Sequence, residues 1–238
     1  MKNLVLLFLI VCSACIAGAQ NHLDLRVGFS SMQAGEWNKT ISAYNFSRPW
    51  LTEKQPELQS AIDFGLGYSG VVGKGIFLTP ELTYQRIQSE ATTNSNRVFV
   101  QMRWFTAGLA LDVYPMEFGL DTVSFGFRPF VRLGVGAASV LPRVFIGDSL
   151  AYSRNEIYDP IIWNVALRAG LGSRIRITDF LDLTPSVMWN YFPKMNLEGF
   201  ANALHGTLQP GLSDEDRIHQ FVFSLALSFR VGKYKKRV

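Results

Sequence analysis

The sequence predicts an all-β protein, an eight-stranded antiparallel transmembrane β-barrel, and three observations lead to that prediction. Apolar and polar residues alternate along eight stretches of the chain, and a period of two is typical of strands with one apolar face. The connections between these stretches are alternately long and short, and an export signal precedes the first of them. Bacterial outer-membrane barrels combine these properties.

Residues 1–19 have the composition of a secretory signal peptide. Lys2 supplies an early positive charge, residues 4–11 form a short apolar run, and residues 17–19 give the small-x-small pattern of a signal-peptidase site. The apolar run is shorter than the roughly 20 residues that a membrane-spanning helix needs. We therefore expect cleavage before Gln20 and one barrel domain over residues 20–238.

In the first half of the expected barrel, each strand places apolar side chains on one face and small or polar side chains on the other. The four strands are expected over residues 22–30, 62–69, 76–85 and 98–113. A tight turn over residues 70–75 joins the second strand to the third, and a polar loop over residues 88–97 follows the third. Residues 98–104 alternate in the opposite phase to residues 105–113, which predicts a β-bulge near Trp104.

The second half continues the same alternation and shows it most clearly in the last strand. The four strands are expected over residues 127–136, 163–172, 181–191 and 221–231. Short turns are expected at residues 115–124 and 178–180, and a long loop at residues 193–217. Three prolines on apolar faces near the turns predict bulges or looser pairing along that rim, namely Pro80, Pro129 and Pro185.

The polar faces and the connections favour a membrane barrel over a soluble barrel of the lipocalin kind. The polar faces carry Gly, Ser, Ala, Thr, Arg and Asp without lysine, which suits a narrow packed interior better than a solvated exterior. Long loops outside and short turns in the periplasm are the usual asymmetry of bacterial barrels, and an even strand number then places both termini in the periplasm. Aromatic residues near the strand ends suit interfacial girdles, namely Tyr68, Tyr84, Trp104, Tyr114, Trp163, Trp189 and Tyr191.

Charge and cysteine content exclude several classes of function. The formal charge of +4 and the pI near 9.1 could indicate nucleic-acid binding, but the arginines stand singly on strand faces and form no basic platform, so no nucleic-acid partner is expected. Both cysteines, Cys12 and Cys15, lie in the signal, which leaves no disulfide or thiolate-bound metal for the barrel. We expect no cofactor and no metal site, and outer-membrane lipid is the expected surrounding.

Charged residues on the polar faces predict a cluster inside the barrel. Such a set could define an ion path, or it could close the interior through mutual ion pairs. Pairing is the usual outcome for charges in a narrow interior, and we favour closure. The expected cluster comprises Arg26, Asp63, Glu81, Asp112, Arg128, Arg132, Arg168, Arg174 and Asp182.

The first long loop contains more aromatic residues than a solvated loop requires. They could bind a protein partner or a glycan, or they could pack over the mouth of the barrel. The expected aromatic patch comprises Trp37, Tyr44, Phe46 and Trp50.

Two histidines are candidates for catalysis, and neither has the partners that an enzyme needs. His219 shares the lipid-facing parity of the last strand, but Phe221 stands where a barrel deacylase would carry its serine. His205 lies in the last loop with no spacing that fixes a nucleophile or base beside it. We therefore expect no enzymatic activity and no catalytic residues.

Three segments carry a resemblance to a known family. Residues 77–84 read Phe-Leu-Thr-Pro-Glu-Leu-Thr-Tyr, residues 127–136 read Phe-Arg-Pro-Phe-Val-Arg-Leu-Gly-Val-Gly, and residues 224–229 read Ser-Leu-Ala-Leu-Ser-Phe. Together they resemble the PorT-like outer-membrane barrels of Bacteroidota, a family that includes an accessory component of type IX protein secretion. The resemblance implies a barrel in a Gram-negative outer membrane and supports the fold far more than any one task.

The functional expectation is a non-enzymatic structural or interaction component of the outer membrane, with periplasmic or surface proteins as partners. An accessory role in type IX-like secretion is its most specific version. A small ion or solute channel is the alternative from another class, and a lipid-modifying barrel enzyme is the third.

Overall fold

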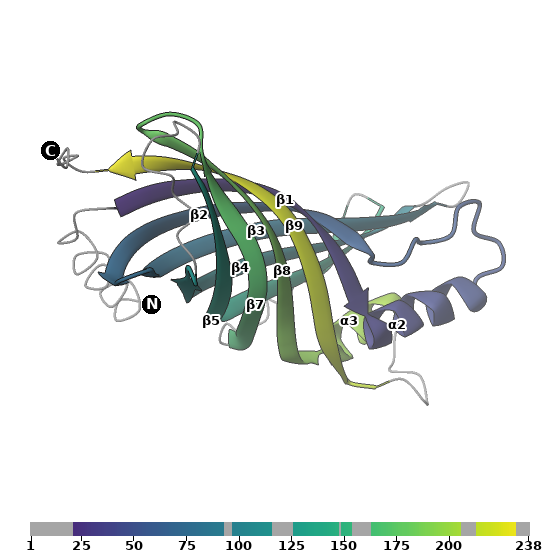
Figure 1. Cartoon of the computed structure of the whole chain (residues 1–238). Coiled ribbons are helices and arrows are strands. Elements are labelled where there is room, and N and C mark those ends of the chain that lie inside the picture. The colour runs from purple at the N-terminus through teal and green to yellow at the C-terminus, as the bar shows by residue number, and fades with distance from the viewer. Residues whose placement is uncertain are drawn as a thin grey trace, which may run out of the picture.

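Eight strands form a closed antiparallel barrel, which confirms the predicted fold class (Figure 1). The computed structural model describes residues 21–92, 97–115, 126–147, 149–153, 163–205 and 213–231, so the predicted signal at residues 1–19 lies outside the described residues. The barrel strands are β1 (Asn21–Ala34), β2 (Ser60–Gly73), β3 (Ile76–Thr92), β4 (Arg97–Val113), β5 (Phe127–Ile146), β7 (Trp163–Arg176), β8 (Leu181–Asn196) and β9 (Glu215–Val231). Each strand pairs with the next, and β1 pairs with β9 to close the ring.

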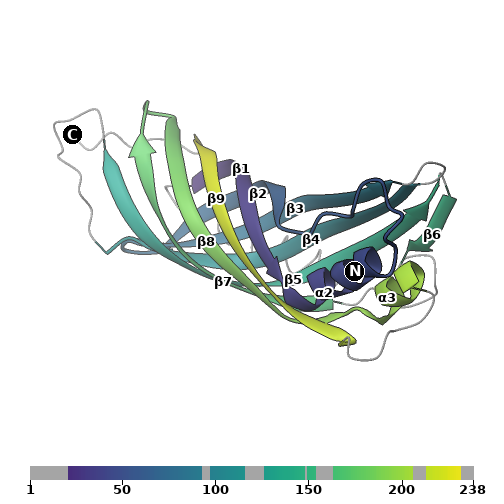
Figure 2. The ribbon, with the colours of Figure 1, turned by 90° about the vertical axis from the view of Figure 1, so that its right-hand side faces the viewer.

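The two ends of the barrel differ in construction. At one end, which we call the turn end, β1 begins opposite the end of β9, with Asn21 paired to Val231. The turn between β2 and β3 lies at this end and needs glycine, because Gly75 has a φ of 68°. The other end, the loop end, carries helix α2 (Gly35–Phe46), helix α3 (Glu198–His205) and the short strand β6 (Ser149–Ser153), which pairs with the end of β5 (Figure 2).

Several strands are longer than a membrane requires. A barrel strand crosses the bilayer in about 9 to 11 residues, whereas β4 has 17 residues and β5 has 20. Figure 2 shows β3, β4 and β5 reaching past the other strands toward the loop end, beside the two helices. The outward faces nearer the turn end form an exposed apolar belt that includes Leu25, Val27, Phe64, Leu66, Phe105, Leu133, Val135, Leu167, Leu171, Val187, Phe223 and Leu225.

The predicted bulge near Trp104 is wrong. The β3–β4 and β4–β5 registers continue unchanged through this residue. Val100, Met102 and Trp104 point inward and are buried, so the strand keeps one phase throughout. The apparent change of phase arises because the interior becomes apolar toward the loop end, while the outward face there becomes polar.

The loops at this end are more ordered than the sequence predicted. Most of the polar loop expected over residues 88–97 is strand, since β3 runs to Thr92 and β4 begins at Arg97. The first and last long loops contain the unpredicted helices α2 and α3. Within the described residues, no helix has the length and apolar composition needed to cross a membrane.

The three strand prolines cause no bulge. The register is the same on both sides of Pro80 in the β2–β3 pair and of Pro185 in the β7–β8 pair, and Pro129 pairs with Ser173 without a shift. The pairing does loosen at two of them, since the β2–β3 ladder is interrupted at Pro80 and the β7–β8 ladder at Pro185. A proline removes one ladder hydrogen bond and need not displace the strand.

Candidate functional site: the barrel interior

The interior of the barrel is divided into a charged layer toward the turn end and an apolar plug toward the loop end. In the charged layer, five arginines and five carboxylates from all eight barrel strands face one another, so their formal charges balance. Its members are Asp24, Arg26, Asp63, Glu81, Asp112, Arg132, Arg168, Arg174, Asp182 and Arg230.

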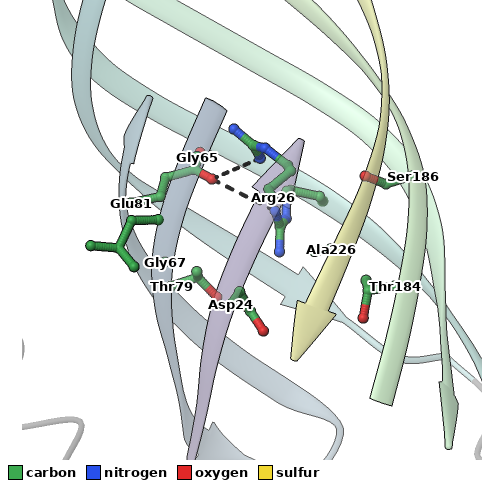
Figure 3. Close-up of a pocket in the computed structure, with 11 residues that line it drawn as sticks. Asp24, Arg26, Gly65, Gly67, Thr79, Glu81, Thr184, Ser186 and Ala226 are labelled. Carbon is green, nitrogen blue, oxygen red and sulfur yellow. Dashed lines mark hydrogen bonds and ion pairs between the residues drawn. The ribbon is translucent and has the colours of Figure 1, made fainter. Parts of the chain in front are cut away.

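Glu81 lies at the centre of the charged layer and contacts three arginines. Its carboxylate accepts a 3.2 Å hydrogen bond from Arg26 (Figure 3) and lies 3.6 Å from Arg132. It also accepts a hydrogen bond from Arg168. Arg168 also donates to Thr83 at 3.1 Å. Because the Glu81 side chain is almost inaccessible to solvent, these arginines replace the water that a carboxylate would otherwise bind.

Two further carboxylates complete this part of the layer. Asp112 forms a bidentate pair with Arg132, with N···O distances of 2.5 and 2.6 Å. Asp63 lies 3.3 Å from Arg26 and accepts a 2.9 Å hydrogen bond from Gln85. The arginines therefore link β1, β5 and β7 to carboxylates on β2, β3 and β4.

A second set of contacts lies nearer the turn end. Arg174 donates to His22 Nδ1 at 2.9 Å, so the proton of this imidazole is on Nε2, which lies 3.4 Å from Asp182. Asp182 also forms a bidentate pair with Arg230 at 2.6 and 3.2 Å, and Asp24 lies 3.7 Å from Arg174. The predicted cluster did not include His22, Asp24 and Arg230, although their strand parity places all three on the inward face.

Arg128 is a predicted member and the second residue of β5, which begins at the turn end. It is half-buried and lies opposite Arg174 in the β5–β7 register. Phe77, Tyr114 and Phe130 pack together at the same end, with the Phe77 and Tyr114 rings 5.0 Å apart. The charged layer is therefore covered by aromatic rings on its turn side.

Small residues make room for the large charged ones. A Cβ atom at Gly65 would lie 2.8 Å from Arg26 Nε, so a larger residue there would displace the Arg26 side chain. The space left in the layer is a cavity of about 20 Å³ whose lining includes Asp24, Arg26, Glu81 and Arg132 (Figure 3). That volume accommodates about one water molecule, and the side chains thus fill the barrel as expected for eight strands.

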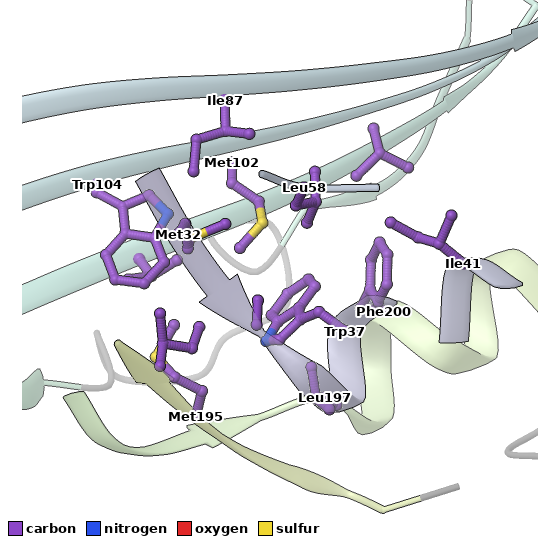
Figure 4. Packing of buried hydrophobic residues seen from close by; sticks show 14 of the residues in the cluster. Met32, Trp37, Ile41, Leu58, Ile87, Met102, Trp104, Met195, Leu197 and Phe200 are labelled. Atoms are coloured by element: carbon purple, nitrogen blue, oxygen red, sulfur yellow. The ribbon is translucent and has the colours of Figure 1, made fainter. Parts of the chain in front are cut away.

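The apolar plug fills the interior at the loop end. Trp104 packs edge-on against Phe192 with ring centres 4.7 Å apart, and Trp37 of α2 packs on Phe200 of α3 at 4.4 Å (Figure 4). Barrel strands, both helices and Leu58 contribute to it. The members of the plug include Met32, Trp37, Ile41, Leu58, Ile87, Val100, Met102, Trp104, Val140, Val144, Phe192, Met195, Leu197, Phe200, Leu204 and Ile218.

The structure does not bring the four residues of the predicted aromatic patch together on one surface. Trp37 and Tyr44 are buried in the plug, with 1% and 4% of their surface exposed. Phe46 and Trp50 are 91% and 66% exposed at the loop end. Helical periodicity explains the division, because Trp37, Ile41 and Tyr44 are spaced along one face of α2 while Phe46 lies outside it.

His219 lies on the outward surface, at the edge of the apolar belt nearer the loop end. Its ring stacks on Tyr191 with centres 4.9 Å apart and on Trp189 at 5.9 Å, as in an interfacial aromatic girdle. The side chain of His205 lies outside the described residues. Among the residues that the structure describes, no group of three or more His, Cys, Asp and Glu side chains could hold a metal ion.

Comparison with known proteins matched no family model and no curated protein sequence. The PorT-like resemblance therefore stays a prediction. Among solved structures, the chain is similar to Neisserial surface protein A, with 9% identity over 89% of this chain and 97% of that one and a TM-score of 0.48. It is also similar to OprG from Pseudomonas aeruginosa, with 14% identity over 91% and 98% of the chains and a TM-score of 0.45. A third similar structure is Ail from Yersinia pestis, with 9% identity over 89% and 99% and a TM-score of 0.38.

The chain is an integral outer-membrane β-barrel by its own architecture. The closed ring of strands satisfies every barrel strand on both edges, and the exposed apolar belt surrounds a polar interior. Two layers of opposite chemistry fill its interior.

Proposed function

We propose that this protein is a non-enzymatic and non-conducting interaction component of the bacterial outer membrane, with both termini in the periplasm and the loop end outside the cell. The observation that carries the proposal is the combination of a filled interior with a well-packed loop end. Charged residues and apolar residues occupy successive sections of the barrel, and the helices above them are part of the same core.

The loop end offers a surface for a partner. Phe46 and Trp50 are exposed on a segment that is held in place, because the guanidinium of Arg48 lies 4.2 Å from the centre of the Tyr44 ring. Arg48 also donates a 3.1 Å hydrogen bond to the carbonyl of Leu204 on α3. Exposed aromatic residues on an ordered segment can bind a protein or a glycan at a low cost in conformational entropy.

Conduction and catalysis are the competing functions. The filled interior argues against conduction, and the surroundings of His219 on the belt argue against catalysis. A path through the barrel would have to separate the ion pairs of Glu81 and displace the plug around Trp104. His219 is stacked against two aromatic rings, and Phe221 follows two residues later on the outward face. We expect lipid A incubated with the purified protein to keep its acyl chains.

An accessory role in type IX-like secretion is the most specific form of the proposal, and it derives from the family resemblance. A strain lacking the protein should accumulate secreted cargo in the periplasm, measured by comparing its secreted and surface proteomes with those of the parent. Complementation with the wild type should restore export, whereas Phe46→Ser combined with Trp50→Ser should restore it only in part.

Lys54→Ser is the matched control, since Lys54 is exposed on the same segment and carries no aromatic ring. Unchanged export in the deletion strain would reject the secretion role. Equal complementation by all variants would reject the loop-end aromatic surface as the site of that role.

A further inference from the structure

The outward face of β3, β4 and β5 carries an unneutralised group of arginines directly above the apolar belt. Arg86 on β3 lies opposite Arg103 on β4 in the strand register. Arg143 on β5 is two residues beyond Leu141, the partner of Arg103, and is therefore its diagonal neighbour at about 7 to 8 Å between backbones. Three arginines thus occupy neighbouring outward-facing positions on adjacent strands, and we call them the arginine triad.

The level of the triad on the barrel is set by its neighbours. Tyr84 and Phe105 are exposed and lie opposite each other. Each lies one outward-facing position nearer the turn end than the arginine of its own strand, Arg86 on β3 or Arg103 on β4. Two residues along a strand span about 6.6 Å. The triad therefore follows the aromatic edge of the belt at the level where lipid headgroups begin. Ile62 on β2 and Leu141 flank the arginine pair on either side.

The triad has amide partners but no carboxylate partners. Arg103 Nε donates to Gln101 Oε1 at 2.7 Å, and Gln88 can accept from Arg86 when its amide oxygen faces the guanidinium. Arg143 Nε is buried and has no hydrogen-bond partner among the described residues. Within the described part of the chain, no aspartate or glutamate forms an ion pair with any of the three arginines.

Such an arrangement is unfavourable without a ligand. Like charges directly opposite each other destabilise a pair of strands. Inside the barrel, by contrast, arginines such as Arg26, Arg132 and Arg168 each form an ion pair with a carboxylate. The outward arginines thus differ from the inward ones in lacking an anion. Guanidinium groups bind phosphate oxygens through paired hydrogen bonds, and phosphate bound to a lipid lies at this level of the membrane.

We propose that the arginine triad binds the phosphate of a phosphorylated glycolipid in the outer leaflet. The lipid's acyl chains would lie along the belt below Tyr84 and Phe105, and its headgroup phosphate would lie between Arg86, Arg103 and Arg143. This inference rests on the orientation in the proposed function, which places the loop end outside the cell.

The test measures lipid binding by the full-length protein in detergent micelles, using native mass spectrometry. The probes are lipid A with its phosphates, the same lipid A after dephosphorylation, and inorganic phosphate as a competitor. We expect phosphorylated lipid A to bind at least tenfold more tightly than the dephosphorylated form. Arg86→Gln combined with Arg103→Gln should remove this preference, and inorganic phosphate should compete only weakly because it lacks the acyl chains.

Arg217→Gln is the matched control, because Arg217 is an exposed arginine at the loop end of β9, away from the triad. It should bind both lipids as the wild type does, and all variants should keep the heat-dependent gel mobility of a folded barrel. Equal binding of phosphorylated and dephosphorylated lipid by the wild type would overturn the proposal, even if the double variant failed to fold. Full competition by inorganic phosphate would show a phosphate site without lipid selectivity, which also overturns it.

The orientation is tested separately by labelling a cysteine introduced at Phe46 on intact cells with a reagent that does not cross the membrane. Labelling is expected. Its absence would reject the orientation in the proposed function, while the binding measurement would still report on the triad itself.

Discussion

The charged layer and the apolar plug occupy the same barrel and are built from the same strands, yet they have opposite chemistry. In the charged layer, inward side chains are charged and the outward side chains are apolar. In the plug, inward side chains such as Met102 and Trp104 are apolar, while outward neighbours such as Arg103 are polar. The pattern therefore inverts along β4 without any change of register, at the level where the strand leaves the lipid.

The difference shows what each environment requires of a barrel. Where lipid surrounds the strands, their outward faces satisfy the hydrophobic requirement, and the interior can contain ion pairs. Where water surrounds them, the interior must supply the apolar core, as in a soluble protein. The two regions should consequently fail in different ways when single residues are changed.

The largest effect is expected in the charged layer at Glu81. Glu81→Ala leaves Arg26, Arg132 and Arg168 without their shared carboxylate in a buried setting, which should lower the free energy of unfolding by about 3–5 kcal/mol. Urea unfolding of the protein folded into phospholipid vesicles measures this change. Removing one positive charge as well, with Glu81→Gln and Arg168→Gln together, should recover part of the loss. A loss near zero for Glu81→Ala would mean that the ion pairs do not support the barrel.

A comparable but more local effect is expected in the plug at Trp104. Trp104→Ala opens a cavity against Phe192 and should cost about 3 kcal/mol. Proteolysis at the loop end should become faster, while the heat-dependent gel mobility of the barrel stays the same. Trp104→Phe should cost much less, because it fills most of the space and removes an indole N–H that has no partner among the described residues. Unchanged proteolysis of Trp104→Ala would argue that the plug does not hold the helices.

A smaller effect is expected where β9 caps helix α2. Asp216 accepts hydrogen bonds of 3.1 Å from the backbone N–H groups of Glu36 and Trp37, so Asp216→Ala should destabilise the loop end by about 1 kcal/mol. Asp216→Asn keeps one acceptor oxygen and should cost less. Hydrogen exchange of the first turn of α2 distinguishes the variants, and equal exchange in all three proteins would contradict the capping role.

The same residue gives a pH dependence with a defined sign. Burial raises the pKa of Asp216 above its ordinary value, so the folded protein disfavours the ionised carboxylate. The loss of stability from the ionised carboxylate is absent at low pH, where Asp216 is protonated in both the folded and the unfolded protein. It appears as the pH rises and the carboxyl group ionises. The protection of the α2 amides, measured as exchange relative to the intrinsic rate at each pH, should therefore fall between acidic and neutral pH in the wild type, and this pH dependence should be weaker in Asp216→Asn.

No measurable effect is expected at the solvated ion pair of Lys194 and Glu215. The two groups lie 2.5 Å apart but are both accessible to water, where such pairs contribute little. Lys194→Ala should leave the unfolding curve unchanged. A clear destabilisation would show that the loop end depends on surface charge as well as on the plug.

The sequence predicts the part of the barrel within the apolar belt well and the part at the loop end poorly. Strand parity alone identifies the inward position of Glu81 and Asp112, because lipid outside and charge inside make the alternation strong. The charge partners could not be predicted, since they depend on register across strands distant in the sequence. Arg168, for example, is 87 residues from Glu81.

The loop end is predicted poorly because its alternation is reversed, with apolar side chains inside and polar side chains outside. Inward apolar residues at 98–104 looked like a change of phase, and the bulge inferred from them does not exist. The spacing of Trp37, Ile41 and Tyr44 is typical of one face of a helix, but the alternation rule predicts only strands and assigns the rest of such a barrel to loops. Similarly, Arg86 lies just beyond the predicted third strand over residues 76–85, and Arg103 lies beside the predicted bulge, so neither was expected on an outward strand face.

The central claim, that the interior is closed, is tested most directly by recording currents from the purified full-length protein in a planar lipid bilayer. The account predicts no steady unitary currents from the wild type, because ion pairs and the plug fill the barrel over successive sections. Steady currents whose size or ion selectivity changes in Arg132→Glu would contradict it, since they would show that ions pass through the charged layer.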